Sequence, residues 1–388
     1  MARPPLSNTP QAPALTQEGG EPNLGPKTRT AATGNWRIRV DVAVSTSGNI
    51  AVAAASAADI RDFSAAVADL RALCGGELEL VNRAIIGAMR SQAPIIGDVA
   101  GHLINAGGKR LRPILTLAAA QLYSYQGDDH IKLAAAVELI HGATLLHDDV
   151  VDASAMRRGE ETANMIWGNK ESVLVGDFLF SQAFELMVSA GSLRVLQILS
   201  RAAGVIAEGE VLQLATQKNL EATFEMYLAV VESKTAALFA AAAQAGAVIA
   251  GADHRGEEAM RSFGRNLGIA YQLVDDALDY SGREKSLGKS VGDDFREGKM
   301  TLPVVYAFDR AAPGDRAFWK RTIADGAQRP EDFDHARRLI ISTRALEDTF
   351  ACARRYAARA VEDLGRAPQN AVTAALAELT VLSASRIS

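Results

Sequence analysis

The chain has few cysteines and no long apolar run, and each scarcity excludes a class of protein. Its 388 residues include two cysteines, Cys74 and Cys352, whose spacing fits neither a metal-binding pair nor a disulfide framework. No uninterrupted apolar stretch approaches the roughly 18 residues that a membrane span needs. The net charge of -5 gives no electrostatic reason to expect nucleic acid as a partner. We therefore expect a protein of a reducing, cytoplasmic setting, without a membrane span and without bound nucleic acid.

Proline, glycine, threonine and alanine dominate residues 1–58, which show no helical period. Such a segment cannot bury enough apolar surface to offset its ordering entropy, so we expect a disordered tail. From Asp59 onward apolar residues recur with helical spacing, and several long segments are apolar on more than one face. The sequence predicts one all-α domain over residues 59–388, a large helical bundle with alanine-rich helices and an open interior.

Two acidic clusters of the form DDxxD interrupt apolar runs. Their aspartates are Asp148, Asp149 and Asp152, in HDDVVD, and Asp275, Asp276 and Asp279, in QLVDDALDY. On a helix, positions i and i+4 share a face, so the outer carboxylates of each cluster repel one another unless a cation lies between them. Oxygen ligands suit Mg²⁺ or Mn²⁺, and Mg²⁺ completes its coordination with water and substrate phosphate. One cluster alone is compatible with a solvated helix surface, but two copies predict a metal site for a phosphorylated substrate.

Basic motifs supply the complement to these carboxylates. They are GGKRLRP with Lys109, Arg110 and Arg112, MRRG with Arg157 and Arg158, SKTA with Lys234, and GKSVGDDFREGKMTLP with Lys289 and Lys299. Arginine forks and lysine point charges both bind diphosphate oxygens. Each motif alone is typical of a surface charge. Together with the acidic clusters they indicate two anion sites, one bridged by metal and one formed by basic side chains.

The order and approximate spacing of these motifs resemble those of the trans-isoprenyl diphosphate synthase family, over essentially everything after about residue 75. The local sequences are most similar to octaprenyl and decaprenyl diphosphate synthases. The resemblance implies a helical bundle around a central substrate tunnel, a homodimer, and a Mg²⁺-dependent prenyltransferase. This enzyme would add isopentenyl diphosphate repeatedly to an allylic diphosphate such as farnesyl diphosphate. Its all-trans product would be the side-chain precursor of ubiquinone.

The resemblance also implies a role for each motif residue. The metal ligands would be Asp148 and Asp152, supported by Asp149, and Asp275, assisted by Asp276 and Asp279. The contacts of the allylic diphosphate would be Arg157, Lys234, Thr235, Gln272, Lys289 and Lys299. The contacts of isopentenyl diphosphate would be Lys109, Arg112, His141 and Arg158. For His141 a hydrogen bond in the core remains an alternative.

Residues one turn before Asp148 act as a ruler for product length in this family, because a helical turn rises about 5.4 Å, close to one isoprene unit. Here they are Ala143 and Thr144, both small, so the tunnel should continue towards Ile140. Met187 is a candidate for the tunnel floor and equally for plain core packing. The ruler excludes only short products, and the resemblance places the product at about C40 to C50.

Other functions use parts of the same pattern. A class I terpene cyclase ionises a diphosphate in an all-α fold, but it normally replaces the second DDxxD and lacks a second basic site. A non-catalytic partner subunit typically loses one acidic motif, and this chain keeps both. A structural bundle with acidic surface patches would not respond to Mg²⁺. The sequence favours the synthase over all three.

Overall fold

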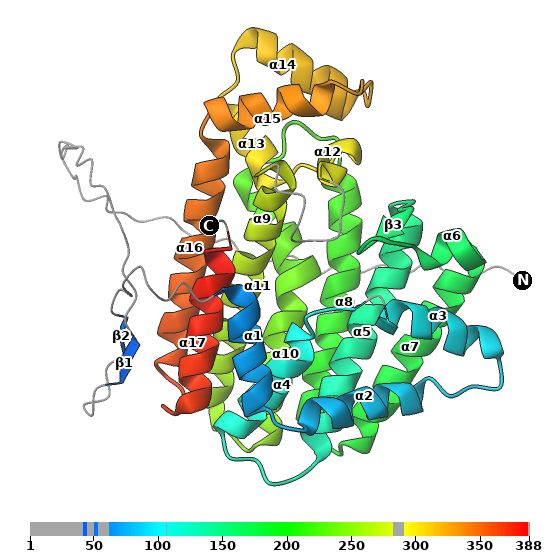
Figure 1. Cartoon of the computed structure of the whole chain (residues 1–388), viewed down its shortest axis with the longest axis vertical. Coiled ribbons are helices and arrows are strands. Elements are labelled where there is room, and N and C mark those ends of the chain that lie inside the picture. The colour runs from blue at the N-terminus through cyan, green and yellow to red at the C-terminus, as the bar shows by residue number, and fades with distance from the viewer. Residues whose placement is uncertain (1–41, 45–49, 53–61, 106, 282–290, 387–388) are drawn as a thin grey trace, which may run out of the picture.

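The computed structural model describes residues 42–44, 50–52, 62–105, 107–281 and 291–386 (Figure 1). These residues are predominantly helical, which confirms the prediction of an all-α bundle. Within the predicted tail, strands β1 (Val42–Val44) and β2 (Ile50–Val52) pair antiparallel. The remainder of residues 1–58 lies outside the described residues, so the expected disorder of the tail stays a prediction.

The helices follow one another with short connections. The N-terminal part contains α1 (Phe63–Leu73), α2 (Glu77–Ala88), α3 (Pro94–Asn105), α4 (Leu111–Leu122), α5 (Asp129–Val151), the hairpin β3 (Met156–Arg157) and β4 (Glu160–Glu161), α6 (Ala163–Trp167), α7 (Asn169–Ser189) and α8 (Leu193–Thr216). The central part contains α9 (Phe224–Val231), the π-helical turn η1 (Glu232–Ala236), α10 (Ala237–Ile249) and α11 (His254–Ser281). The C-terminal part contains α12 (Asp293–Arg296), α13 (Leu302–Asp309), α14 (Pro313–Trp319), the π-helical turn η2 (Lys320–Ala324), α15 (Asp332–Ser342), α16 (Ala345–Leu364) and α17 (Ala371–Ala384).

Small residues bring the central helices into close contact. A Cβ atom added at Gly246 of α10 would lie 2.2 Å from the carbonyl oxygen of Thr116 on α4. One added at Gly264 of α11 would lie 2.4 Å from the carbonyl oxygen of Phe239 on α10. The backbones of α4, α10 and α11 therefore pack directly on one another, and the alanines of these helices are almost all buried. This packing fixes α11 against α10 on one side, and α11 also packs on α16 (Figure 1).

The long helices α5 and α11 carry the acidic clusters at their C-terminal ends. Both helices are anchored in apolar cores: α5 through residues such as Leu133 and Ile140, and α11 through Leu273 and Tyr280. Asp148 and Asp275 therefore project from rigid elements. A site built on helices anchored in this way keeps its geometry.

Two helical stretches are long and apolar enough to cross a membrane by length and composition, Asn169–Ser189 and Phe224–Ile249. Of their most apolar windows, 33% and 56% of the residues are buried inside the protein. Buried helices of large bundles have this composition as well, so the finding does not show a membrane span.

Candidate active site

A cavity of about 400 Å³ lies between the C-terminal ends of α5 and α11, with further walls from α8, α9 and η1. Predicted site residues make up much of its lining: Arg112, His141, Thr144, Asp148, Asp152, Arg157, Arg158, Lys234, Thr235, Gln272, Asp275, Asp276, Asp279 and Lys299. Residues from both acidic clusters and from the basic motifs, far apart in the sequence, thus face one space.

In the first cluster, Asp148 and Asp152 face the cavity and Asp149 does not. Neighbouring residues point about 100° apart on a helix, so Asp149 turns into the protein, where it is 2% exposed. Its Oδ1 accepts hydrogen bonds from Nε of Arg157 at 2.9 Å and from Nη2 at 2.6 Å. Asp149 therefore fixes an arginine at the cavity wall and contributes no oxygen to the cavity.

The hairpin after α5 places Arg157 and Arg158. Its turn has a positive φ at both central residues, 55° at Arg158 and 87° at Gly159. This combination suits the right-handed twist of a two-residue hairpin, and glycine adopts it readily. Both arginines consequently reach the cavity that Asp148 and Asp152 line.

Asp276 of the second cluster is enclosed by hydrogen bonds. Tyr227 donates its hydroxyl to Oδ2 at 2.6 Å, and Nε2 of Gln272 donates to Oδ1 at 2.7 Å. The hydroxyl of Thr235 in turn donates to Oε1 of Gln272 at 2.8 Å. Burial raises the pKa of Asp276 to about 8. Asp276 thus organises Tyr227, Gln272 and Thr235 in one network on the cavity wall.

Asp279 and Asp275, the outer aspartates of the second cluster, differ in their hydrogen bonding. The carboxylate of Asp279 accepts the backbone N–H groups of Gly292 and Asp294, at 2.9 and 3.1 Å, so it holds the segment at the start of α12. Burial, together with the charge of Asp294, raises its pKa to about 7. Asp275 keeps a buried Oδ1 without a hydrogen bond, 3.3 Å from Nη1 of Arg386. Asp275 lines the cavity too, and unlike Asp276 and Asp279 it has an oxygen that accepts no hydrogen bond from the described residues, so we call it open, together with Asp148 and Asp152.

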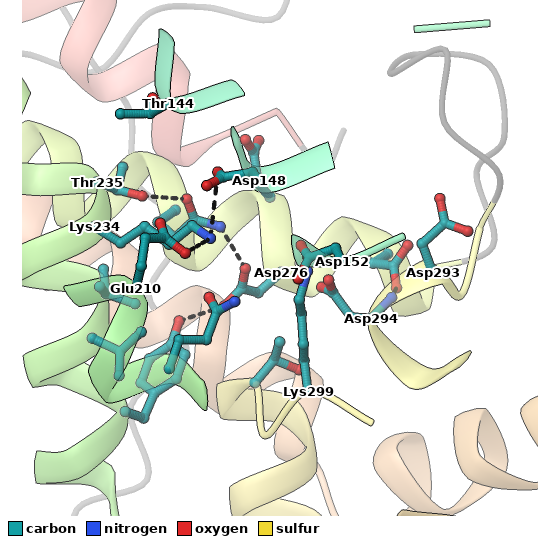
Figure 2. A pocket seen from close by; sticks show the side chains of 18 of the residues that line it. Thr144, Asp148, Asp152, Glu210, Lys234, Thr235, Asp276, Asp293, Asp294 and Lys299 are labelled. Atoms are coloured by element: carbon teal, nitrogen blue, oxygen red, sulfur yellow. Dashed lines mark hydrogen bonds and ion pairs between the residues drawn. The ribbon is translucent and has the colours of Figure 1, made fainter. Parts of the chain in front are cut away.

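Each carboxylate that is open to the cavity has a cation opposite it from a distant part of the chain. The pairs are Lys234 Nζ with Asp148 Oδ2 at 3.4 Å, Lys299 Nζ with Asp152 Oδ2 at 3.0 Å, and Arg386 Nη1 with Asp275 Oδ1 at 3.3 Å (Figure 2 shows the two lysines). Burial alone would lower the pKa of Lys299, but the carboxylates around it raise the pKa overall. Lys299 is therefore charged, and both lysines line the cavity where an anion would bind.

A second basic group lies beside these pairs. Nη1 of Arg112 lies 3.1 Å from Nε2 of His141. Burial, together with the charge of Arg112, lowers the pKa of His141 well below its usual value, so the imidazole is neutral. Because a guanidinium only donates, Nε2 accepts and the ring proton is on Nδ1. Arg158 lines the same cavity, whereas Lys109 is not among its lining residues and its ammonium lies 4.7 Å from the ring centre of Phe63.

The predicted ruler residues divide between cavity and core. Thr144 lines the cavity. Ala143, Ile140 and Met187 are 0%, 0% and 1% exposed and belong to the apolar core. The predicted diphosphate contact Lys289 lies outside the described residues.

The sequence analysis missed Glu210, Tyr227 and Arg386. Glu210 shares one face of α8 with Ile206 and Gln213, at i, i+4 and i+7. A charged residue one turn after a buried apolar position could have been recognised from the sequence as a candidate. Tyr227 and Arg386 gave no such signal, because a tyrosine in an apolar helix indicates core and a charge near the chain end indicates solvent.

The open carboxylates fit a hard divalent cation. Asp148, Asp152 and Asp275 offer oxygen ligands only, and a buried oxygen of Asp275 has no hydrogen-bond donor. Among the described residues no three acidic, histidine or cysteine side chains form a metal cage by themselves. Mg²⁺ is an ion of this kind, and it characteristically keeps several waters and takes ligands from substrate phosphates.

Solved structures of similar proteins share this fold. A polyprenyl synthase from Caulobacter crescentus, crystallised with calcium and isoprenyl diphosphate, is 52% identical, covers 83% of this chain and 98% of its own, and superposes with a TM-score of 0.81. A decaprenyl diphosphate synthase from Rhodobacter capsulatus is 48% identical over 83% of this chain and 99% of its own, with a TM-score of 0.80. The molecule thus has the fold of an all-α isoprenyl synthase.

The profile of the polyprenyl synthetase family matches residues 93–340. Octaprenyl diphosphate synthase of Escherichia coli is 47% identical over 246 residues, which are 63% of this chain and 76% of that protein. The chain belongs to the polyprenyl synthetase family, and it is a polyprenyl diphosphate synthase, a prenyltransferase.

Proposed function

We propose that this enzyme uses Mg²⁺ to condense isopentenyl diphosphate repeatedly onto an allylic diphosphate, with a long all-trans polyprenyl diphosphate as product. The observation that carries the proposal is the cavity itself, where open carboxylates on two walls meet two separate groups of basic side chains. Such a cavity suits one diphosphate bound through metal and another bound by cations alone.

Asp148, Asp152 and Asp275 would hold the metal against the allylic diphosphate. The metal would supply Lewis-acid stabilisation to the leaving group. Lys234, Arg157 and Lys299 add fixed positive charge where negative charge develops as the allylic C–O bond breaks. The apolar wall formed by residues such as Ile206 excludes water from the carbocation.

Arg112, Arg158, Lys109 and His141 form the site for isopentenyl diphosphate. The neutral His141 donates through Nδ1 and adds no charge, while the arginines supply forked donors for phosphate oxygens. With both substrates held, the double bond meets the carbocation before water does. Loss of a proton then restores an alkene, with the released diphosphate as base, so no side-chain nucleophile takes part.

Product analysis tests this function directly. The purified protein is incubated with Mg²⁺, farnesyl diphosphate and labelled isopentenyl diphosphate, and the dephosphorylated lipids are separated by length. We expect a dominant band at octaprenyl to decaprenyl length, the products named for the relatives in Escherichia coli and Rhodobacter capsulatus. Absence of elongation by folded, metal-supplemented protein would contradict the proposal and favour a partner-subunit role. From the resemblance to octaprenyl and decaprenyl diphosphate synthases, we also propose that the product serves ubiquinone synthesis and that the enzyme is cytoplasmic.

We further propose that the enzyme is a homodimer in which α7 and α8 meet their counterparts. These helices expose large apolar side chains that are unusual for a free surface: Leu174 (67%) and Val188 (63%) on α7, and Leu193 (84%) and Val211 (67%) on α8. A permanent homodimer buries a face of this kind. Sedimentation analysis should give twice the monomer mass, and the double substitution Leu174→Glu and Val188→Glu should give monomers. A monomeric wild-type protein would contradict the proposal.

A further inference from the structure

Glu210 is a cavity carboxylate that belongs to neither acidic cluster. It projects from α8, and its Oε2 lies 2.7 Å from Nζ of Lys234. The same ammonium lies 3.4 Å from Oδ2 of Asp148 on α5. Figure 2 shows Lys234 linked to both carboxylates. The shorter contact is the one to Glu210, so the ammonium is held nearer to α8 than to the acidic cluster.

Backbone packing fixes this arrangement. A Cβ atom added at Gly209 would lie 2.7 Å from Cβ of Ser233 and 2.9 Å from the backbone nitrogen of Lys234. The backbone of α8 therefore lies directly against the π-helical turn η1, immediately beside Glu210. Single π-helical turns within helices occur frequently at functional sites. The distance between Glu210 and Lys234 is thus set by two packed main chains and does not depend on side-chain flexibility alone.

Without Glu210, the ammonium of Lys234 would have Asp148 as its remaining acidic partner among these three groups. A lysine bound fully to Asp148 would compete with a divalent cation for the same oxygens. It would also be drawn away from a diphosphate bound in the cavity. The carboxylate on α8 therefore opposes the pull of Asp148 on Lys234.

We propose that Glu210 is a positioning residue that holds Lys234 off Asp148, leaving Asp148 open to metal and the ammonium directed at the allylic diphosphate. The inference rests on the proposed function, since it assigns Lys234 and Asp148 their roles there. Glu210 acts through Lys234 and does not itself contact the reacting atoms.

A double-mutant cycle on Glu210→Gln and Lys234→Ala tests this. Calorimetric titration of Mn²⁺ with inorganic diphosphate into each protein measures metal loading without turnover. Steady-state kinetics give KM for each substrate separately. We expect Glu210→Gln to weaken Mn²⁺ binding and raise KM for farnesyl diphosphate by about tenfold, the effect of one charge-assisted hydrogen bond, with KM for isopentenyl diphosphate unchanged. In the Lys234→Ala background, Glu210→Gln should have no further effect, because the group through which it acts is missing.

Two further variants of α8 glutamates serve as controls for the charge change in Glu210→Gln. Glu208 lies on the exposed side of α8 two residues earlier, so Glu208→Gln carries the same charge change and should behave like wild type. Glu210→Asp retains the charge with a shorter reach and should fall between Glu210→Gln and wild type. Effects of Glu210→Gln that multiply with those of Lys234→Ala would overturn the proposal, as would wild-type metal binding in Glu210→Gln. Either result leaves the proposed function intact, because that function fails only if the wild-type enzyme does not elongate.

Discussion

Thr144→Phe tests whether the first turn before the metal ligands measures the product. Thr144 lines the cavity four residues before Asp148, which is about 6 Å along α5 at 1.5 Å per residue. One isoprene unit is close to one helical turn, so a phenyl ring at this position obstructs the chain within its first few units. The wild-type product is expected to be of octaprenyl to decaprenyl length. We expect the Thr144→Phe product to be about C15.

The assay needs a primer shorter than the expected limit. Geranyl diphosphate, labelled isopentenyl diphosphate and Mg²⁺ are incubated with each variant, and the dephosphorylated lipids are separated by length. Thr144→Val, which nearly preserves the volume and replaces the hydroxyl with a methyl group, should retain the long product. An unchanged product length in Thr144→Phe would refute the ruler.

Ala143→Phe is the companion test from the same turn. Ala143 is fully buried in the apolar core, unlike Thr144, so a phenyl ring there must displace packed neighbours. We expect a shorter product together with a loss of about 1–3 kcal/mol in the free energy of unfolding. Denaturant titration measures the second effect, and unchanged stability would show that the site has more room than the core packing indicates.

Further predictions concern the acidic clusters. Asp148→Asn should lower turnover by about 10²-fold or more, since a ligand that stabilises the transition state is lost; radiolabel incorporation measures this, and near-normal turnover would contradict the assignment. The same variant should leave the metal-free protein at least as stable, because burial raises the pKa of Asp148 and disfavours its charge. Tyr227→Phe should lower the free energy of unfolding by about 1–2 kcal/mol, because a buried oxygen of Asp276 loses its 2.6 Å donor; an unchanged denaturation midpoint would show that water replaces the hydroxyl. Since the pKa of Asp276 is raised to about 8 on folding, its contribution to stability is present at low pH and is lost as pH rises towards 8. Denaturant titration of chelator-treated protein at several pH values should show this decline, and a flat profile would contradict it.

Local patterns predicted the parts of the site that depend on helical spacing. Asp148 and Asp152 share a face because they are four residues apart, and the structure places both in the cavity. The middle aspartates required tertiary information. Asp149 is held by Arg157 from a hairpin, and Asp276 by Tyr227 from another helix. No sequence pattern shows which partner a buried carboxylate will find.

The surroundings of Lys234 illustrate the same limit. SKTA has the composition of an ordinary helix, yet it forms a π-helical turn against Gly209. The tertiary contact between two main chains decides this geometry, and local propensity does not. The overall bundle was more predictable, because its apolar periodicity repeats over many turns and does not depend on any single contact.

The cations opposite the open carboxylates couple the binding of metal in this cavity to the binding of diphosphate. Lys234 and Lys299 lie 3.4 and 3.0 Å from Asp148 and Asp152. A metal ion arriving alone adds positive charge beside these ammonium groups, whose other acidic partners, Glu210 for Lys234 and Glu297 for Lys299, only partly balance it in a partly dry space. A metal ion that arrives with diphosphate brings an anion that both the metal and the lysines can bind. Metal and diphosphate should therefore load the enzyme together, each strengthening the binding of the other, and the empty cavity should retain little of either alone.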